Sequence, residues 1–376
     1  MPHPDPHTAN DRLRAATLQL AMTGHASDFR RVAELLLKPG ALNTDTYRVY
    51  IAHGPAPQRD HLLDRCQEAV GSDAFVARCL AYDTDIVIIA PLPPLDVTVG
   101  WDSTGTRLRH LINPHHDWHL GGSGITDLNH ISQAYADASN ALLGARYTTD
   151  RAALYSSDLR LASVVDDRAP AWAAALLAPL LNQPAARAEQ LRKTIRFALV
   201  FNHTVAANLL LTSRNVVARR MRHVSKLLSL DLNRMRDRAI LDLAIEVCML
   251  ADCGIVPTGD VPTLPDLLST TEVHSWATSL LGRLDADSRP LRRSLLAWLT
   301  HDGHVDAAAG ALGLRPAAVR QHLRAAETLL HRRLLGSQPH DREEAMGVVG
   351  SGGVYLAAVA VGEIEVGKWP EARPRL

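Results

Sequence analysis

The spacing of apolar positions changes along the chain and predicts parts of different structure. In residues 11–38, apolar residues recur at helical spacing on either side of Gly24, which predicts two short helices. After residue 40 the apolar runs become short and strand-like, and the run over 86–90 is typical of a buried strand. We expect strands over 47–52, 75–82, 85–91 and 95–101, a glycine-rich edge strand over 120–125, and helices over 60–70 and 127–143. Residues 42–150 are therefore predicted to form an α+β domain with one sheet, after a helical segment over 1–41.

From residue 158 onward the pattern is almost entirely helical, and it repeats. The matching pairs are 171–177 with 275–281, 191–195 with 291–295, and 217–228 with 319–330, at offsets of 104, 100 and 102 residues. Three matches in the same order indicate an old internal duplication, although two Ala- and Leu-rich stretches can also look alike by chance. The predicted units span 158–253 and 266–338, with a Pro- and Gly-rich linker over 254–265 and a tail over 339–376.

The second unit has the pattern of a helix-turn-helix. An Ala-rich stretch over 305–311 precedes a turn at Gly313, and Pro316 stands near the start of the next helix, where its missing N–H costs nothing. The predicted buried stripe of that helix consists of Val319, Leu323, Ala326 and Leu330.

The first unit repeats this order. A helix over 205–210 is followed by a turn over 211–213 and a second helix from Arg214. Leu211 stands where the second unit has its turn glycine, Gly313. The predicted buried stripe consists of Val217, Met221, Val224 and Leu228.

Polar residues off these stripes are the candidate DNA-binding residues. Arg suits two-point contacts with guanine or phosphate, Asn suits adenine, and a helix N-terminus can receive a phosphate. A basic helix face can equally be solvated, or paired with acidic residues of a neighbouring domain. The candidates are Ser213, Arg214, Asn215, Arg219, Arg220, Arg222, Arg315, Arg320, Gln321, His322 and Arg324.

The charge distribution favours a polyanionic partner. The formal net charge is zero, from 40 basic and 40 acidic residues. Residues 191–238 nevertheless hold eleven Lys or Arg and two Asp or Glu, and residues 289–333 hold eight Arg and three acidic residues. Two basic islands in an otherwise acidic chain indicate local sites for a polyanion.

Residues 305–330 resemble the C-terminal helix-turn-helix of PucR/CdaR-type bacterial transcriptional regulators. The pattern of that family is an Ala-rich helix, Leu-Gly-Val, then His-Arg-Asn-Thr-Val and an Arg-rich helix. The first unit keeps the Arg-Asn pair as Arg214 and Asn215, whereas the second unit has Pro316 and Ala317 at that place. The tandem arrangement departs from the single copy usual in the family.

Residues 121–128 and 131–142 resemble the degenerate GGDEF-like module of the same family. Residues 82–86 stand where a diguanylate cyclase has its glycine and carboxylate turn, and they lack both the glycines and the carboxylate pattern. The resemblance spans residues 10–335. It implies a sensory or dimerising domain without cyclase activity, followed by DNA-binding units.

Other chemistry has weaker support in the sequence. Three histidines within five residues, beside an aspartate, could bind a metal, but no fourth ligand and no glutamate stand at a metalloprotease spacing. Residues 121–124 lack the Lys-Ser/Thr of a phosphate-binding loop, and Ser156 and Ser157 lie in no nucleophile elbow. We therefore expect a loop cluster of histidines, no catalytic, metal or cofactor site, and no enzymatic activity. The histidine cluster comprises His115, His116 and His119, with Asp117.

The cysteines and one uncharged segment bear on the cellular compartment. The four cysteines form no CxxC pair and no signal peptide is recognisable, so we expect reduced thiols in a cytoplasmic protein. Residues 345–362 carry no charge but contain several glycines and are short for a membrane span, so we expect a strand or helix docked on the body. The cysteines are Cys66, Cys79, Cys248 and Cys253.

These features predict a sequence-specific, DNA-binding transcriptional regulator that reads the major groove of double-stranded DNA. We expect a homodimer without membrane association, whose N-terminal domain responds to a small-molecule effector or a protein partner. One alternative is a nucleotide- or metal-binding enzyme that acts through residues 42–150. Another is a structural adaptor, which the basic islands disfavour because protein interfaces are usually depleted of charge at their centre.

Overall fold

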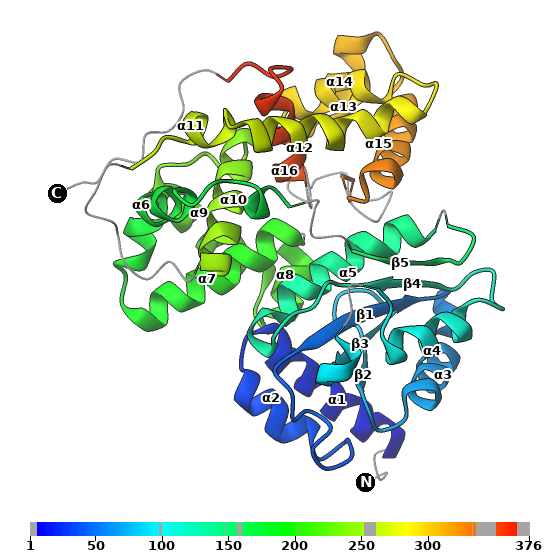
Figure 1. Ribbon diagram of the computed structural model, residues 1–376. Coiled ribbons are helices and arrows are strands. Elements are labelled where there is room, and N and C mark those ends of the chain that lie inside the picture. Colours follow the sequence, from blue (N-terminus) through cyan, green and yellow to red (C-terminus); the bar gives the residue numbers. More distant parts are fainter. Residues whose placement is uncertain are drawn as a thin grey trace. The chain divides into compact units, whose positions relative to one another are not determined.

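The computed structural model describes residues 6–97, 100–146, 148–155, 160–201, 203–251, 261–332, 334–335 and 351–366. Contacts between Cα atoms divide the chain into two compact units. Unit 1 comprises Met1–Ser156 with Asn208–Leu210, and unit 2 comprises Ser157–Ala207 with Leu211–Leu376. The predicted α+β class is confirmed, because unit 1 holds a five-stranded sheet and the described elements of unit 2 are helices (Figure 1).

The sheet of unit 1 has the strand order β2-β3-β1-β4-β5. Its pairs are antiparallel except β4 with β5, which run parallel. β1 and β3 are the two long apolar runs, as expected of strands buried on both faces, and they pair along their whole length. The strands are β1 Tyr47–His53, β2 Phe75–Arg78, β3 Asp85–Pro91, β4 His119–Gly122 and β5 Ala152–Leu154.

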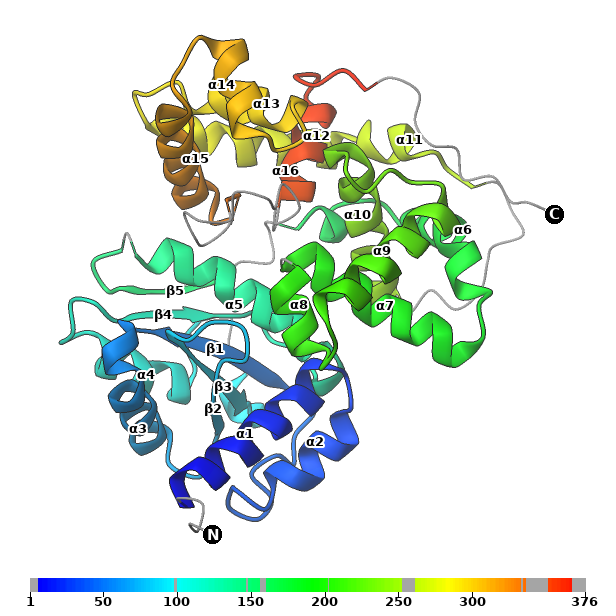
Figure 2. The same ribbon diagram turned by 180° about the vertical axis from the view of Figure 1, so that it is seen from behind.

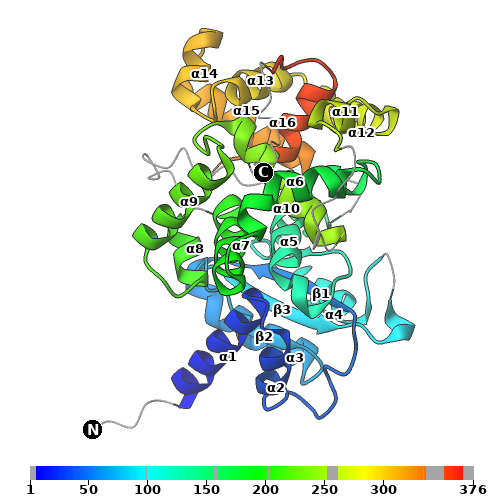
Figure 3. The same ribbon diagram turned by 90° about the vertical axis from the view of Figure 1, so that its left-hand side faces the viewer.

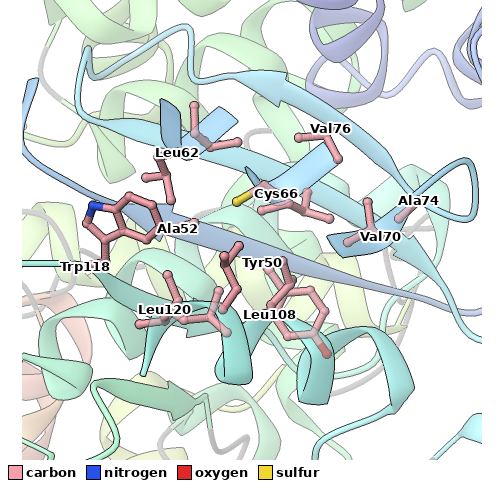
Figure 4. Close-up of a cluster of buried hydrophobic side chains, with 14 of the residues drawn as sticks. Tyr50, Ala52, Leu62, Cys66, Val70, Ala74, Val76, Leu108, Trp118 and Leu120 are labelled. Carbon is pink, nitrogen blue, oxygen red and sulfur yellow. The ribbon is translucent and has the colours of Figure 1, made fainter. Parts of the chain in front are cut away.

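Helices cover both faces of this sheet. α3 and α4 pack on one face, where Tyr50 and Ala52 of β1 meet Leu62, Cys66 and Leu108 in one apolar cluster (Figure 4). α5 packs on β1 and β4 from the other face, because alternate residues of a strand point to opposite sides. The helices are α1 Pro6–Met22, α2 Ala26–Ala33, α3 Arg59–Val70, α4 Ser103–Ile112 and α5 Ile131–Ala145.

Three predicted elements of unit 1 differ from the structure. The strand over 95–101 is wrong, since Pro94–Asp96 forms a 3-10 turn, and residues 98–99 lie outside the described ranges. The strand over 75–82 ends early, at Arg78. The glycine-rich edge over 120–125 is not an edge, because β4 lies between β1 and the three-residue strand β5, which is too short to leave an alternating pattern.

Unit 2 consists of helices in two successive groups (Figures 1 and 2). The first group is α6 Ala169–Leu181, α7 Ala185–Val200, α8 His203–Leu209, α9 Arg214–Leu228 and α10 Met235–Ala251. The second group is α11 Leu264–Leu268, α12 Thr271–Gly282, α13 Leu291–Thr300, α14 Val305–Leu312, α15 Pro316–Leu330 and α16 Ser351–Ala360. The predicted subdivision at residues 254–265 stays a prediction, because most of that segment lies outside the described ranges.

The uncharged C-terminal segment contains α16, which packs against α10 and α12. This is the docked helix expected there, although residues 345–350 lie outside the described ranges. Among the helices that the structure describes, none combines the length and the hydropathy needed to cross a bilayer. Among the described residues, Cys66, Cys79 and Cys248 form no disulfide, and Cys253 lies outside the described ranges.

Candidate nucleic-acid interface

The segment predicted as the second helix-turn-helix ends in three helices, α13, α14 and α15, that pack on one another. α14 packs against α13 and α15, and α13 packs against α15. Gly313 ends α14 at φ +66°, in the left-handed region that suits glycine, and the Leu314 N–H donates to the Ala309 carbonyl at 3.0 Å. The predicted stripe of α15 is buried against this support.

The segment predicted as the first helix-turn-helix has the same turn with a different residue in it. Leu211 adopts φ +44°, and the Thr212 N–H donates to the Ala207 carbonyl at 2.9 Å. The Ser213 hydroxyl then caps α9 by accepting from the Val216 N–H. A leucine that is 78% exposed therefore holds a backbone conformation that glycine would hold without strain.

The helices that pack against α9 differ from those that pack against α15. α9 packs against α6 and α7, and its predicted stripe is buried. Asn208 and Leu209, the last residues of α8, group with unit 1, whereas α14 lies wholly in unit 2. The sequence gives no sign of this difference, because the two turns have similar patterns.

Nine of the eleven candidate DNA-binding residues are exposed, either just before or within α9 and α15. They include the residues at the start of α9 and two arginines further along that helix. The nine are Ser213, Arg214, Asn215, Arg219, Arg222, Arg315, Arg320, Gln321 and Arg324.

The other two candidates, Arg220 and His322, are half-buried and lie against the preceding brace helix. Arg220 donates to the Thr194 hydroxyl at 3.3 Å, and the His322 Nδ1 is hydrogen-bonded to the Ser294 hydroxyl at 2.7 Å. Each follows one residue of the buried stripe by three positions and precedes another by four, which places it at the edge of the buried face of its helix. The prediction that both side chains face outward is corrected, because the Thr194 hydroxyl on α7 holds Arg220 and the Ser294 hydroxyl on α13 holds His322.

Two exposed arginines in the middle of α9 form no ion pair with the described residues. Within the part of the chain that the structure describes, Arg219 and Arg222 have no carboxylate oxygen within 4.0 Å. In α15 the same holds for Arg324, while Arg320 lies 3.9 Å from Asp306.

Neighbouring basic groups also act on one another around α9. Burial, and then the positive charges of Arg187 and Arg219, lower the pKa of Arg220. Burial, and then Arg214, lower the pKa of His203. Positive charges that crowd together on one part of a surface favour an anionic ligand. Arg187, on α7, lies outside the basic island counted in the sequence, and only the fold brings it near Arg220.

The histidine cluster of unit 1 is built into the fold. His115 stacks on Trp118 with ring centroids 3.8 Å apart, and the Trp118 Nε1 donates to the Gln58 Oε1 at 2.8 Å. His119 begins β4. Among the described residues, no three His, Cys, Asp or Glu side chains are placed to hold a metal ion.

The comparisons with known proteins assign no family. No family model matches the chain. An uncharacterized protein of the pkwA 5' region of Thermomonospora curvata is 37% identical over 95 residues, which cover 24% of this chain and 50% of that protein. The chain thus spans about half the length of the curated relative it matches.

Among solved structures, the chain is similar to a regulator of polyketide synthase expression from Bifidobacterium adolescentis. The match covers 66% of this chain and 96% of that one, with 17% identity and a TM-score of 0.29. A similarity at this level carries no argument about function.

Proposed function

We propose that this protein is a transcriptional regulator of the PucR/CdaR type that binds double-stranded DNA through α9 and α15. The observation that carries the proposal is the exposed face of α9. It presents Arg219 and Arg222 one turn apart, opposite a buried stripe, with no protein carboxylate within 4.0 Å in the described ranges. The second helix of a helix-turn-helix presents such a face to the major groove.

The start of α9 adds two kinds of contact. Arg214 and Asn215 are exposed in its first turn, where free backbone N–H groups and the helix dipole favour a phosphate. Arg suits guanine or phosphate and Asn suits adenine, so this end of α9 has groups for both the backbone and the base edges. Phosphate contacts position the protein, and base contacts supply sequence preference.

The remaining parts of the proposal concern regulation. Unit 1 is the sensory module, which responds to a small-molecule effector or a protein partner without catalysis. The protein acts in the cytoplasm, where its DNA is. The expected homodimer belongs to this proposal and concerns unit 1.

The test is selection of a duplex from random double-stranded DNA by the full chain, followed by affinity measurements on the recovered site. Arg219→Ala and Arg222→Ala should each weaken binding by about 1–3 kcal/mol if the side chain contacts a base. Arg31→Ala is the matched control, because Arg31 is an exposed arginine of α2 in unit 1, and it should bind as the wild type does. Recovery of no preferred duplex, or equal affinity for all four proteins, would contradict the proposal.

A further inference from the structure

We infer that one chain reads a bipartite DNA site, with α9 on one half-site and α15 on a second half-site of different sequence. The inference rests on the proposed function and goes beyond it, because it concerns how many chains a site requires. It follows from the way the two helical groups of unit 2 repeat and pair.

The repeat extends to the packing of whole helices. α6 packs on α10 as α12 packs on α16, and α7 packs on α9 as α13 packs on α15. α16 is therefore the structural counterpart of α10. The sequence did not reveal this pair, because the Gly- and Ala-rich α16 shares few residues with α10.

Backbone details repeat at a constant offset of 102 residues. The left-handed turn residues Leu211 and Gly313 are one such pair, and the helix-ending residues Ser229 and His331 are another, at φ +56° and +50°. The Leu230 N–H donates to the Ser225 carbonyl at 3.0 Å, and the Arg332 N–H donates to the Glu327 carbonyl at 3.1 Å, at the same offset. The two groups are thus copies of one unit down to their caps.

The copies pair through equivalent elements, as the subunits of a two-fold dimer do. α10 of the first copy packs against α16 of the second. The approach is close: a Cβ added at Gly352 would lie 3.3 Å from the Ala239 Cα and 2.7 Å from the Asp242 Oδ2. The Ser351 hydroxyl donates to the Met235 Sδ at 3.1 Å across this contact. A contact in which the same surface serves both partners is the mark of two-fold symmetry.

The pairing places the two candidate reading helices at opposite ends of unit 2. In Figures 1 and 2, α9 lies on one side of the paired α10 and α16, and α15 lies on the other, while Figure 3 shows the pair end-on. Dimeric helix-turn-helix proteins use two subunits to present two such helices to successive turns of the major groove. Here a single chain carries both.

The two reading faces differ in chemistry. At the 102-residue offset Arg222 corresponds to Arg324, but Arg219 corresponds to Gln321 and Asn215 to Ala317. Arg favours guanine and Gln favours adenine in the major groove. The half-sites therefore share one position and differ at others, so the site is an imperfect palindrome.

The experiment uses the full chain and the duplex recovered by selection. Footprinting maps the protected bases, and sedimentation gives the number of chains on the duplex. Two double variants change equivalent positions: Arg219→Ala with Arg222→Ala in α9, and Gln321→Ala with Arg324→Ala in α15. All four side chains are exposed, so both variants should unfold at the wild-type temperature, which a thermal melt verifies.

The expected result is two protected segments, one chain per duplex, and loss of a different segment in each variant, with affinity reduced about tenfold or more. The inference would be overturned if the wild type protected a single DNA segment and the α15 variant protected the same segment equally well. The proposed function would still stand in that case. Two chains for every bipartite duplex would do the same, whereas a dimer joined through unit 1 that carries two duplexes keeps the expected ratio of one chain per duplex. Failure of the wild type to bind any duplex would remove the proposed function, and the inference with it.

Discussion

Replacing Asp102 by alanine tests the buried polar centre of unit 1. Asp102 and Arg48 are 2% and 1% exposed, and the Arg48 Nη1 lies 3.0 Å from the Asp102 Oδ2. The same carboxylate accepts from the Tyr50 hydroxyl and, at 2.8 Å, from the Gly105 N–H, which caps α4. Removal of one partner of a buried ion pair costs about 3–5 kcal/mol, because the other charge stays buried without its counter-ion. Loss of a helix cap alone costs about 1 kcal/mol.

We expect Asp102→Ala to lower the free energy of opening of β1 and α4 by about 3–5 kcal/mol. Hydrogen exchange of peptides from these two elements is the suitable assay, because a chain of two units need not unfold in one step. The control is Asp150→Ala, which removes an exposed partner of Arg109 at 2.7 Å and should cost at most about 1 kcal/mol. Equal protection of β1 in the two variants would refute the reasoning about the buried pair.

Two further predictions concern unit 2. Leu211→Gly should raise the free energy of unfolding by up to about 1 kcal/mol, because it relieves the left-handed backbone strain at an exposed position. Gly313→Leu should lower it by about 1–2 kcal/mol, because it introduces that strain. Melting temperatures of the two variants that change in the same direction would contradict this. Burial, and then Glu246, raise the pKa of Asp242 above its unfolded value of 3.8, so the folded state holds a proton that the unfolded state has lost. Stability should therefore fall as the pH rises above about 4 toward the raised pKa, and Asp242→Asn should flatten this dependence in melts from pH 5 to 8; equally steep profiles would speak against it.

Local patterns predicted much of the fold. The alternation and apolar runs located β1 and β3, and the 3.6-residue spacing located α9 and α15 with their buried stripes. These elements are set by residues close in sequence. The order of helix, turn and helix in each half of unit 2 was visible for the same reason.

The rest depends on residues far apart in the chain. α4 begins at a cap whose carboxylate is fixed by Arg48, 54 residues away, and no local pattern records that partner. Arg220 and His322 were placed outward because the hydroxyls of Thr194 and Ser294, 26 and 28 residues earlier, were not visible as neighbours. The sequence did not identify α16 as the counterpart of α10 in the second helical group, because the two helices are alike in packing and not in sequence.

The salt dependence of DNA affinity tests the central claim most directly. If the exposed arginines of α9 lie against phosphates, the logarithm of the wild-type association constant should fall steeply and linearly with the logarithm of the salt concentration. Removal of Arg219 and Arg222 should make that slope shallower by about 0.9 for each phosphate that the protein no longer neutralises. A wild-type affinity that does not change with salt, or a slope that both substitutions leave unaltered, would contradict the account.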